Sequence, residues 1–119
     1  DSVQHRIANA RVQIDQARLL VLRAAWRLDR YGHRDARKDV SMIKVAVPRM
    51  LQQIVDDAIQ VFGAMGGSDD TPLHAMLANA RALRIYDGPD EVHLRQVFRL
   101  ENAPEWSVAD SPYLMPLPE

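Results

Sequence analysis

Apolar residues recur from Val3 to Tyr31 at alternating spacings of four and three residues. This spacing puts them on one stripe of an α-helix and predicts a helix over Asp1–Tyr31 that packs on another helix at a shallow crossing angle. Alanines alternate with larger side chains along the stripe, which permits close approach. We expect Gly32 to end the helix. The stripe consists of Val3, Ile7, Ala10, Ile14, Ala17, Val21, Ala24, Leu28 and Tyr31.

The same spacing continues between Asp35 and Phe62 and predicts a second long helix there. Apolar residues lie on more than one side of it, which is typical of a central helix. Pro48 lies inside the pattern, so we expect a kink just before it. Asp57 occupies a position where an apolar residue is due, and it requires a partner if it is buried.

A glycine-rich loop over residues 63–70 separates this helix from a third one. We expect Thr71 to cap the third helix, Pro72 to open it and Tyr86 to lie near its end. The loop alone is weak evidence for phosphate binding, because no strand precedes it.

The next turn joins the third helix to a fourth that ends near residue 101. Gly88 is suited to the left-handed conformation that ends a helix, and Pro89 to the start of the next one. Asp90 and Glu91 follow in the first turn, where acidic groups favour the helix dipole. Asp87 is thereby held at the bend. From spacing alone, the simplest interpretation is a well-made turn.

The pattern therefore predicts an all-α, antiparallel helical bundle over residues 1–101, with a proline-rich, extended arm over 102–119. A length of 119 residues fits one domain. The first residues read as if the chain begins partway into a helix, which suggests a fragment of a longer protein. No residues have the spacing of a metal site, and no apolar run is long enough for a membrane span.

The charge and cysteine content narrow the function classes. A net charge of −1 gives no general attraction to nucleic acid, and the absence of cysteine excludes thiol nucleophiles. The densest positive cluster covers residues 23–38. We interpret it as a solvated helix end whose arginines pair with Asp29, Asp35 and Asp39, in preference to a phosphate site.

Two runs, Ala58–Gly63 with the glycine loop after it and Arg81–Gly88, resemble the C-terminal helical domain of the acyl-CoA dehydrogenases. The string Asp87–His93 looks like the subgroup that has Asp-Gly-Pro in place of Glu-Gly-Thr. Residues 24–26 and 42–49 also fit that subgroup. The resemblance covers about residues 1–101, without the first helix of the family domain.

The resemblance implies an FAD-dependent parent enzyme that oxidises acyl-CoA to trans-2-enoyl-CoA, with Asp87 as the catalytic base. Gly88 then matches a substrate position beside the thioester. The cofactor positions fall into two groups, of which the first contacts the FAD of an adjoining subunit. These groups are Gln60, Val61, Phe62, Gly63 and Ala64, and then Pro89, Asp90 and Glu91.

The same resemblance implies a homodimer or homotetramer that passes electrons to an electron-transfer flavoprotein. It implies a location in the bacterial cytoplasm or, in a eukaryote, in the mitochondrial matrix or peroxisome. Alone, the chain is expected to hold no FAD and to be inactive. Two alternatives stay open: a helical assembly module without chemistry, or a related flavin oxidase, since the resemblance extends to a branch that oxidises nitroalkanes and has Asp, as at Asp87, in the base position.

Overall fold

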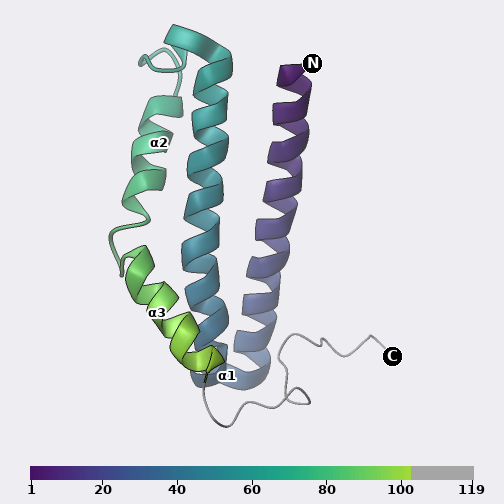
Figure 1. The fold of residues 1–119 in the computed structure, drawn as a ribbon, viewed down its shortest axis with the longest axis vertical. Helices are drawn as coiled ribbons and strands as arrows, with labels where there is room; N and C mark the ends of the chain where they lie inside the picture. The colour runs from purple at the N-terminus through teal and green to yellow at the C-terminus, as the bar shows by residue number, and fades with distance from the viewer. Residues whose placement is uncertain (103–119) are drawn as a thin grey trace.

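The computed structural model describes residues 1–102, which fold as helices joined by turns (Figure 1). The all-α prediction is confirmed. The order of elements is α1 (Ser2–Phe62), the short 3₁₀ helix η1 (Gly63–Met65), α2 (Leu73–Ala82) and α3 (Asp90–Glu101). Apart from Asn102, the predicted proline-rich arm lies outside the described residues.

Helix α1 folds back on itself at Gly32, as the sequence predicts. Gly32 has φ 80° and ψ 176°, which is non-helical and strained for any residue with a side chain. It divides α1 into an N-terminal arm (residues 2–31) and a second arm (residues 33–62), which run side by side in opposite directions (Figure 1).

The second arm is the central element. The N-terminal arm lies on one side of it, and α2 and α3 follow one another along the other side (Figure 1). Small side chains fill the contacts between these helices, which lets their backbones approach closely. The buried apolar residues are Ala17, Ala24, Ala36, Val45, Val55 and Ala80.

Two expectations for the second arm have different outcomes. Pro48 is buried and keeps helical backbone angles, so the interruption of α1 comes from Gly32 and not from Pro48. Asp57 does have a partner, because it forms an ion pair with Arg6 that links the two arms.

Helix α2 is shorter than predicted at both ends. Thr71 does not cap it. Its hydroxyl instead donates to the carbonyls of Met65 and Gly66 in the preceding loop. The helix ends at Ala82, four residues before Tyr86, and the chain tightens into turns. The carbonyl of Leu83 accepts a hydrogen bond from a side chain of the second arm, as described next.

None of the described helices combines the length and the apolar character that crossing a membrane requires. Within residues 1–102, no cluster of three or more metal-ligating side chains is placed to hold an ion.

Candidate functional site

The bend between α2 and α3 places two consecutive residues in left-handed conformations. Asp87 has φ 54° and Gly88 has φ 93°. Asp tolerates this region better than most residues with a side chain, because its short polar group bonds locally. Pro89 then follows with φ −67° and ψ 164° as the N-cap of α3, so the helix starts one residue later than predicted. The left-handed Gly88 is confirmed.

The carboxylate of Asp87 is not bound by this scaffold. Its residue is exposed, and within residues 1–102 the side chain forms neither a hydrogen bond nor an ion pair. Gly88 and Pro89 beside it are half-buried, and Glu91 is exposed. The bend therefore presents a carboxylate on an ordered backbone and leaves its oxygens available to a ligand.

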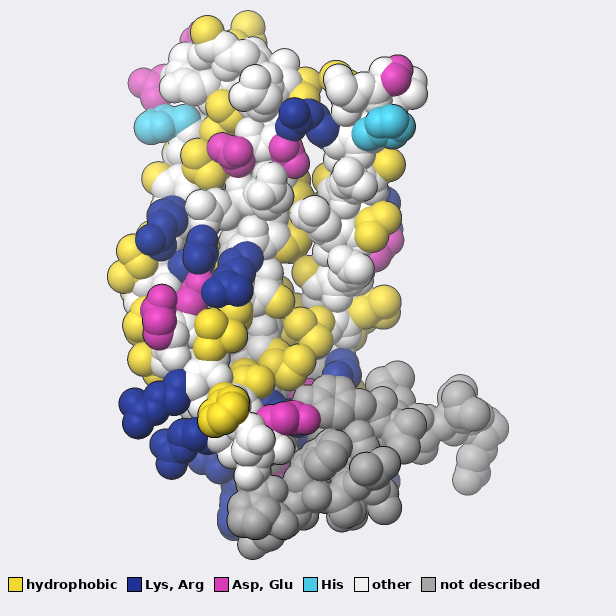
Figure 2. Space-filling model, in the orientation of Figure 1, with side chains coloured by type: hydrophobic (Ala, Val, Ile, Leu, Met, Phe, Trp, Pro, Cys, Tyr) yellow, Lys and Arg dark blue, Asp and Glu magenta, His cyan; other side chains and the backbone are white. Residues whose placement is uncertain are grey.

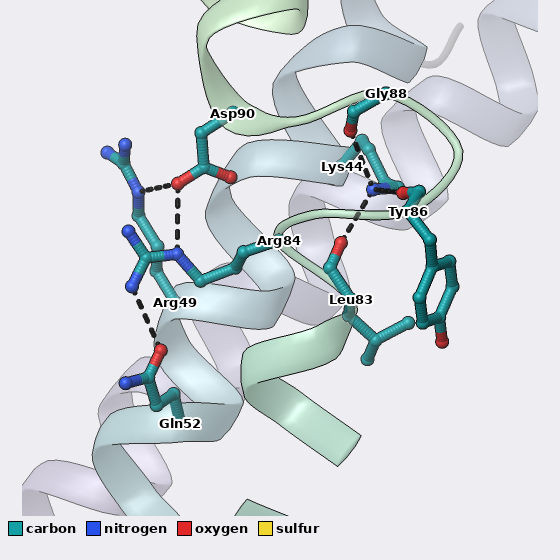
Figure 3. Close-up of polar contacts among 8 residues, drawn as sticks. All are labelled: Lys44, Arg49, Gln52, Leu83, Arg84, Tyr86, Gly88 and Asp90. Carbon is teal, nitrogen blue, oxygen red and sulfur yellow. Dashed lines mark hydrogen bonds and ion pairs between the residues drawn. The ribbon is translucent and has the colours of Figure 1, made fainter. Parts of the chain in front are cut away.

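Asp90 has the opposite environment, although it is only three residues further on. It is 5% exposed and accepts hydrogen bonds from Arg84 Nε at 2.9 Å and Arg49 Nε at 3.1 Å (Figure 3). Burial alone would raise the pKa of Asp90, but the hydrogen bonds and charges of Arg84 and Arg49 outweigh it and hold that pKa below its usual 3.8. Arg84 also donates to Gln52 at 2.9 Å. The side chain of Asp90 thus fastens the start of α3 to the second arm.

Lys44 of the second arm reaches the inner side of the bend. Its ammonium donates to the carbonyl oxygens of Leu83 at 2.6 Å, Tyr86 at 2.9 Å and Gly88 at 3.2 Å (Figure 3). It also lies 5.9 Å from the centre of the Tyr86 ring. These contacts give hydrogen-bond partners to carbonyls of the bend that lie beyond the end of α2 at Ala82.

His93 on α3 closes the other side of the bend. Its Nε2 lies 3.1 Å from the carbonyl oxygen of Asp87, and its Nδ1 lies 3.3 Å from the hydroxyl of Ser41 on the second arm. A methyl group on Gly88 would come within 2.8 Å of the same Nε2. Glycine is therefore required here for space as well as for its backbone angle.

The first predicted cofactor group, Gln60, Val61, Phe62, Gly63 and Ala64, lies at the end of α1, where all five residues are exposed. The group adjoins the loop before α2, whereas Asp87 follows α2, so the two lie at opposite ends of that helix, as expected (Figure 1). A helix of this length spans about 15 Å. The structure therefore keeps the two predicted groups apart in one chain.

Two arginines of the positive cluster of residues 23–38 pair with Asp39, as interpreted from the sequence, but Asp29 and Asp35, the other two predicted partners, form no ion pair within residues 1–102. Arg23 and Arg27 lie 3.1 Å and 2.8 Å from the carboxylate of Asp39, and Lys38 lies 2.7 Å from Glu101. Asp39 and Arg27 are buried, so this part of the cluster is a support for the turn at Gly32 and is not solvated.

Sequence reasoning missed the residues that hold the bend: Lys44, Arg49, Arg84 and His93. Their partners lie up to 52 positions away along the chain, so local spacing carried no signal for the pairing. One signal was present. A charged residue within the apolar pattern of a central helix, such as Lys44, requires polar partners.

Comparisons with known proteins agree with this geometry. Residues 1–100 match a family model described as the C-terminal domain of acyl-CoA dehydrogenase. The chain is 53% identical over 105 residues to the Mycobacterium tuberculosis protein named "Probable acyl-CoA dehydrogenase FadE2", covering 88% of this chain and 26% of that one. It is 50% identical over 99 residues to human acyl-CoA dehydrogenase family member 11, covering 83% of this chain and 13% of that one.

Solved structures give the same result. A "putative acyl-CoA dehydrogenase" from Mycobacterium abscessus superposes with a TM-score of 0.82 at 55% identity, over 85% of this chain and 25% of that one. A chain from the electron-transferring flavoprotein of Acidaminococcus fermentans superposes with a TM-score of 0.77 at 28% identity, over 85% and 26% of the two chains. The present chain thus spans about a quarter or less of the proteins it matches.

Proposed function

Because this chain belongs to the acyl-CoA dehydrogenase family, as its C-terminal domain, we propose that it supplies the catalytic base of an FAD-dependent enzyme that oxidises acyl-CoA to trans-2-enoyl-CoA. The proposed base is Asp87. The observation that carries the proposal is the exposed carboxylate on a bend whose backbone is bound from two sides.

The chemistry assigned to Asp87 is removal of a proton from the carbon next to the thioester. A base needs a fixed direction of approach and a free lone pair, and the bend provides both. Gly88, with no side chain, leaves room for the thioester beside the carboxylate. Asp90 can contact the cofactor only with its backbone, because its side chain is bound to Arg49 and Arg84.

The exposed group at the end of α1 suits an FAD contact. Phe62 is 55% exposed and Val61 45% exposed, and Gln60, which precedes them, is exposed too, so the group offers apolar surface and hydrogen-bonding groups to a planar ring system. Gly63 and Ala64 continue this surface, and Pro89 and Glu91 form the second group. FAD, when bound, supplies the hydride acceptor for the neighbouring carbon.

Since α2 separates the two groups, we assign them to two different flavins, one in this subunit and one in an adjoining subunit. This arrangement requires a homodimer or homotetramer. The proposed electron acceptor is an electron-transfer flavoprotein. The proposed location is the bacterial cytoplasm or, in a eukaryote, the mitochondrial matrix or peroxisome.

The test uses the full-length enzyme that contains this domain. Asp87→Asn keeps size and hydrogen bonding and removes the base, so anaerobic stopped-flow reduction of the flavin by acyl-CoA should slow by about 10²–10⁴-fold. Binding of acyl-CoA should change little. Asp87→Glu should retain measurable activity, although Glu fits the left-handed angle less well. If the flavin of Asp87→Asn is reduced as fast as that of the wild type, Asp87 is only a turn residue and not the base.

A flavin oxidase is the second candidate, and the shorter carboxylate of Asp87 at a φ of 54° is the observation that favours it. The two candidates differ in their electron acceptor. Rapid reoxidation of the reduced enzyme by O₂, together with turnover of a nitroalkane, would identify the oxidase. Slow reoxidation with acyl-CoA turnover identifies the dehydrogenase.

A further inference from the structure

The backbone around Asp87 is bound by a side chain from a distant part of the chain. Lys44 donates to the carbonyls of Leu83 and Tyr86, which precede Asp87, and of Gly88, which follows it (Figure 3). An ammonium group has three N–H donors. These three hydrogen bonds use all of them, so the lysine is fully engaged by the bend.

The carbonyl of Asp87 itself is bound by His93. With its proton on Nε2, a neutral His93 donates to the Asp87 oxygen at 3.1 Å, and its Nδ1 accepts from the Ser41 hydroxyl at 3.3 Å. The three consecutive carbonyls of residues 86–88 are therefore all tied to the second arm, two by Lys44 and one through His93 and Ser41.

The bend needs such support because its local conformation is unfavourable. A left-handed backbone is unfavourable at any residue with a side chain, although less so for Asp than for most. Ile85 and Tyr86 are 58% and 47% exposed, so they bury little apolar surface in exchange. The polar contacts from the second arm thus hold Asp87 at its φ of 54°.

We propose that Lys44 is the positioning residue for Asp87: it fixes the backbone on both sides of the carboxylate without contacting the carboxylate or the reacting atoms. The inference rests on the proposed function, in which Asp87 is the base. Its consequence is kinetic, because a displacement of about 1 Å in a reacting group can slow a reaction by about 100-fold.

The first test compares Lys44→Met, Lys44→Arg and Arg81→Gln in the full-length, FAD-loaded enzyme. Arg81 is an exposed cation in the last turn of α2, the helix that leads into the bend, and serves as the matched control for loss of charge. In Lys44→Met, reduction of the flavin by acyl-CoA should slow by about 100-fold, while the dissociation constant of acyl-CoA changes less than about threefold. Lys44→Arg keeps N–H donors and should recover part of the rate. Arg81→Gln should match wild type.

Equal rates in Lys44→Met and wild type would overturn the inference. So would a large increase in the dissociation constant with an unchanged rate, since that places Lys44 in substrate binding. If Asp87→Asn reduces flavin as fast as wild type, the proposed function fails, whatever Lys44 does. A slow Asp87→Asn with a fast Lys44→Met refutes the positioning role alone.

A double-mutant cycle shows whether Lys44 acts through Asp87. If it does, Lys44→Met combined with Asp87→Asn reduces flavin no more slowly than Asp87→Asn alone, because the positioned group is already removed. If the double variant instead loses rate by the product of the two single fold-reductions, Lys44 acts independently of Asp87, and the inference is overturned.

Amide hydrogen exchange gives a readout that needs no turnover. Lys44→Met should exchange about tenfold faster over residues 83–90, with α2 and the second arm unchanged. Uniformly faster exchange across α1, α2 and α3, or a variant that does not fold, would show that Lys44 supports the whole domain and would overturn the specific role.

Discussion

The guanidinium of Arg84 donates to the buried carboxylate of Asp90 at 2.9 Å across the bend that carries Asp87. The two residues stand on either side of the bend, and Arg49 of the second arm joins the same carboxylate oxygen at 3.1 Å. The bend is therefore closed by an ion pair and fastened to α1 by a second one. The three carboxylates at the bend, Asp87, Asp90 and Glu91, look equivalent in the sequence, but Asp90 is buried and paired whereas Asp87 and Glu91 are exposed.

Asp90→Asn should destabilise the domain by about 1–3 kcal/mol, because it removes a charge and leaves two arginines around a buried amide. Glu91→Gln is the matched control, since Glu91 is the adjacent, exposed acid of the same first turn and should cost about 0.3–1 kcal/mol. Chemical unfolding of the two variants measures the difference. If the two variants lose the same unfolding free energy, Asp90 stabilises the domain only through the helix dipole.

The contribution of Asp90 should also depend on pH. Its pKa is lowered in the folded protein, so its stabilisation is present above the unfolded pKa and is lost as the pH falls through the folded pKa. The difference in unfolding free energy between wild type and Asp90→Asn should stay constant from pH 7 to about 5 and shrink below about 4. A difference that grows towards acid pH would contradict the lowered pKa.

Gly88→Ala should lower stability by at least about 1 kcal/mol, because a φ of 93° is unfavourable for alanine and its methyl group would meet His93 Nε2 at 2.8 Å. Gly67→Ala is the control. Its methyl group would have only the Ala64 carbonyl nearby, at 3.8 Å. Thermal unfolding should separate the two variants. A neutral Gly88→Ala would mean that the bend adjusts freely.

The N-terminal arm should drive self-association of the isolated domain. Ile7, Leu19 and Leu22 are 66%, 67% and 58% exposed, and Figure 2 shows apolar side chains along this arm. Covering such surface is favourable at about 25 cal/mol per Å². Leu19→Lys should weaken association in analytical ultracentrifugation, whereas Gln4→Lys adds the same charge at an exposed polar position and should not. A wild-type monomer at high concentration would contradict the prediction.

The 119-residue chain by itself should not retain FAD. Its two proposed flavin groups lie at opposite ends of α2, and each offers only one side of a binding site. Gel filtration after incubation with FAD, followed by absorbance at flavin wavelengths, tests this. If the protein is still yellow after gel filtration, one of the two groups is sufficient to retain FAD. Dehydrogenase activity in that sample would show that this chain catalyses the reaction by itself.

The sequence by itself was sufficient to predict the helices, the reversal at Gly32 and the left-handed Gly88. Each of these depends on local preferences: the helical repeat of apolar residues, and the backbone angles that glycine alone adopts easily. The resemblance added the family, which the match over residues 1–100 confirms.

Only the tertiary structure decided where α2 ends and which polar groups hold the bend. Lys44 competes for the carbonyls of Leu83 and Tyr86 from 39 and 42 positions away, so local propensity extended the helix too far. From the sequence, Asp90 is predicted to be an acidic residue in the first turn of a helix. In the structure it is buried and forms ion pairs with Arg49 and Arg84. Asp87, three residues earlier, keeps its carboxylate available because no described side chain reaches it. That difference arises from packing on the second arm, which brings together residues that no local spacing relates.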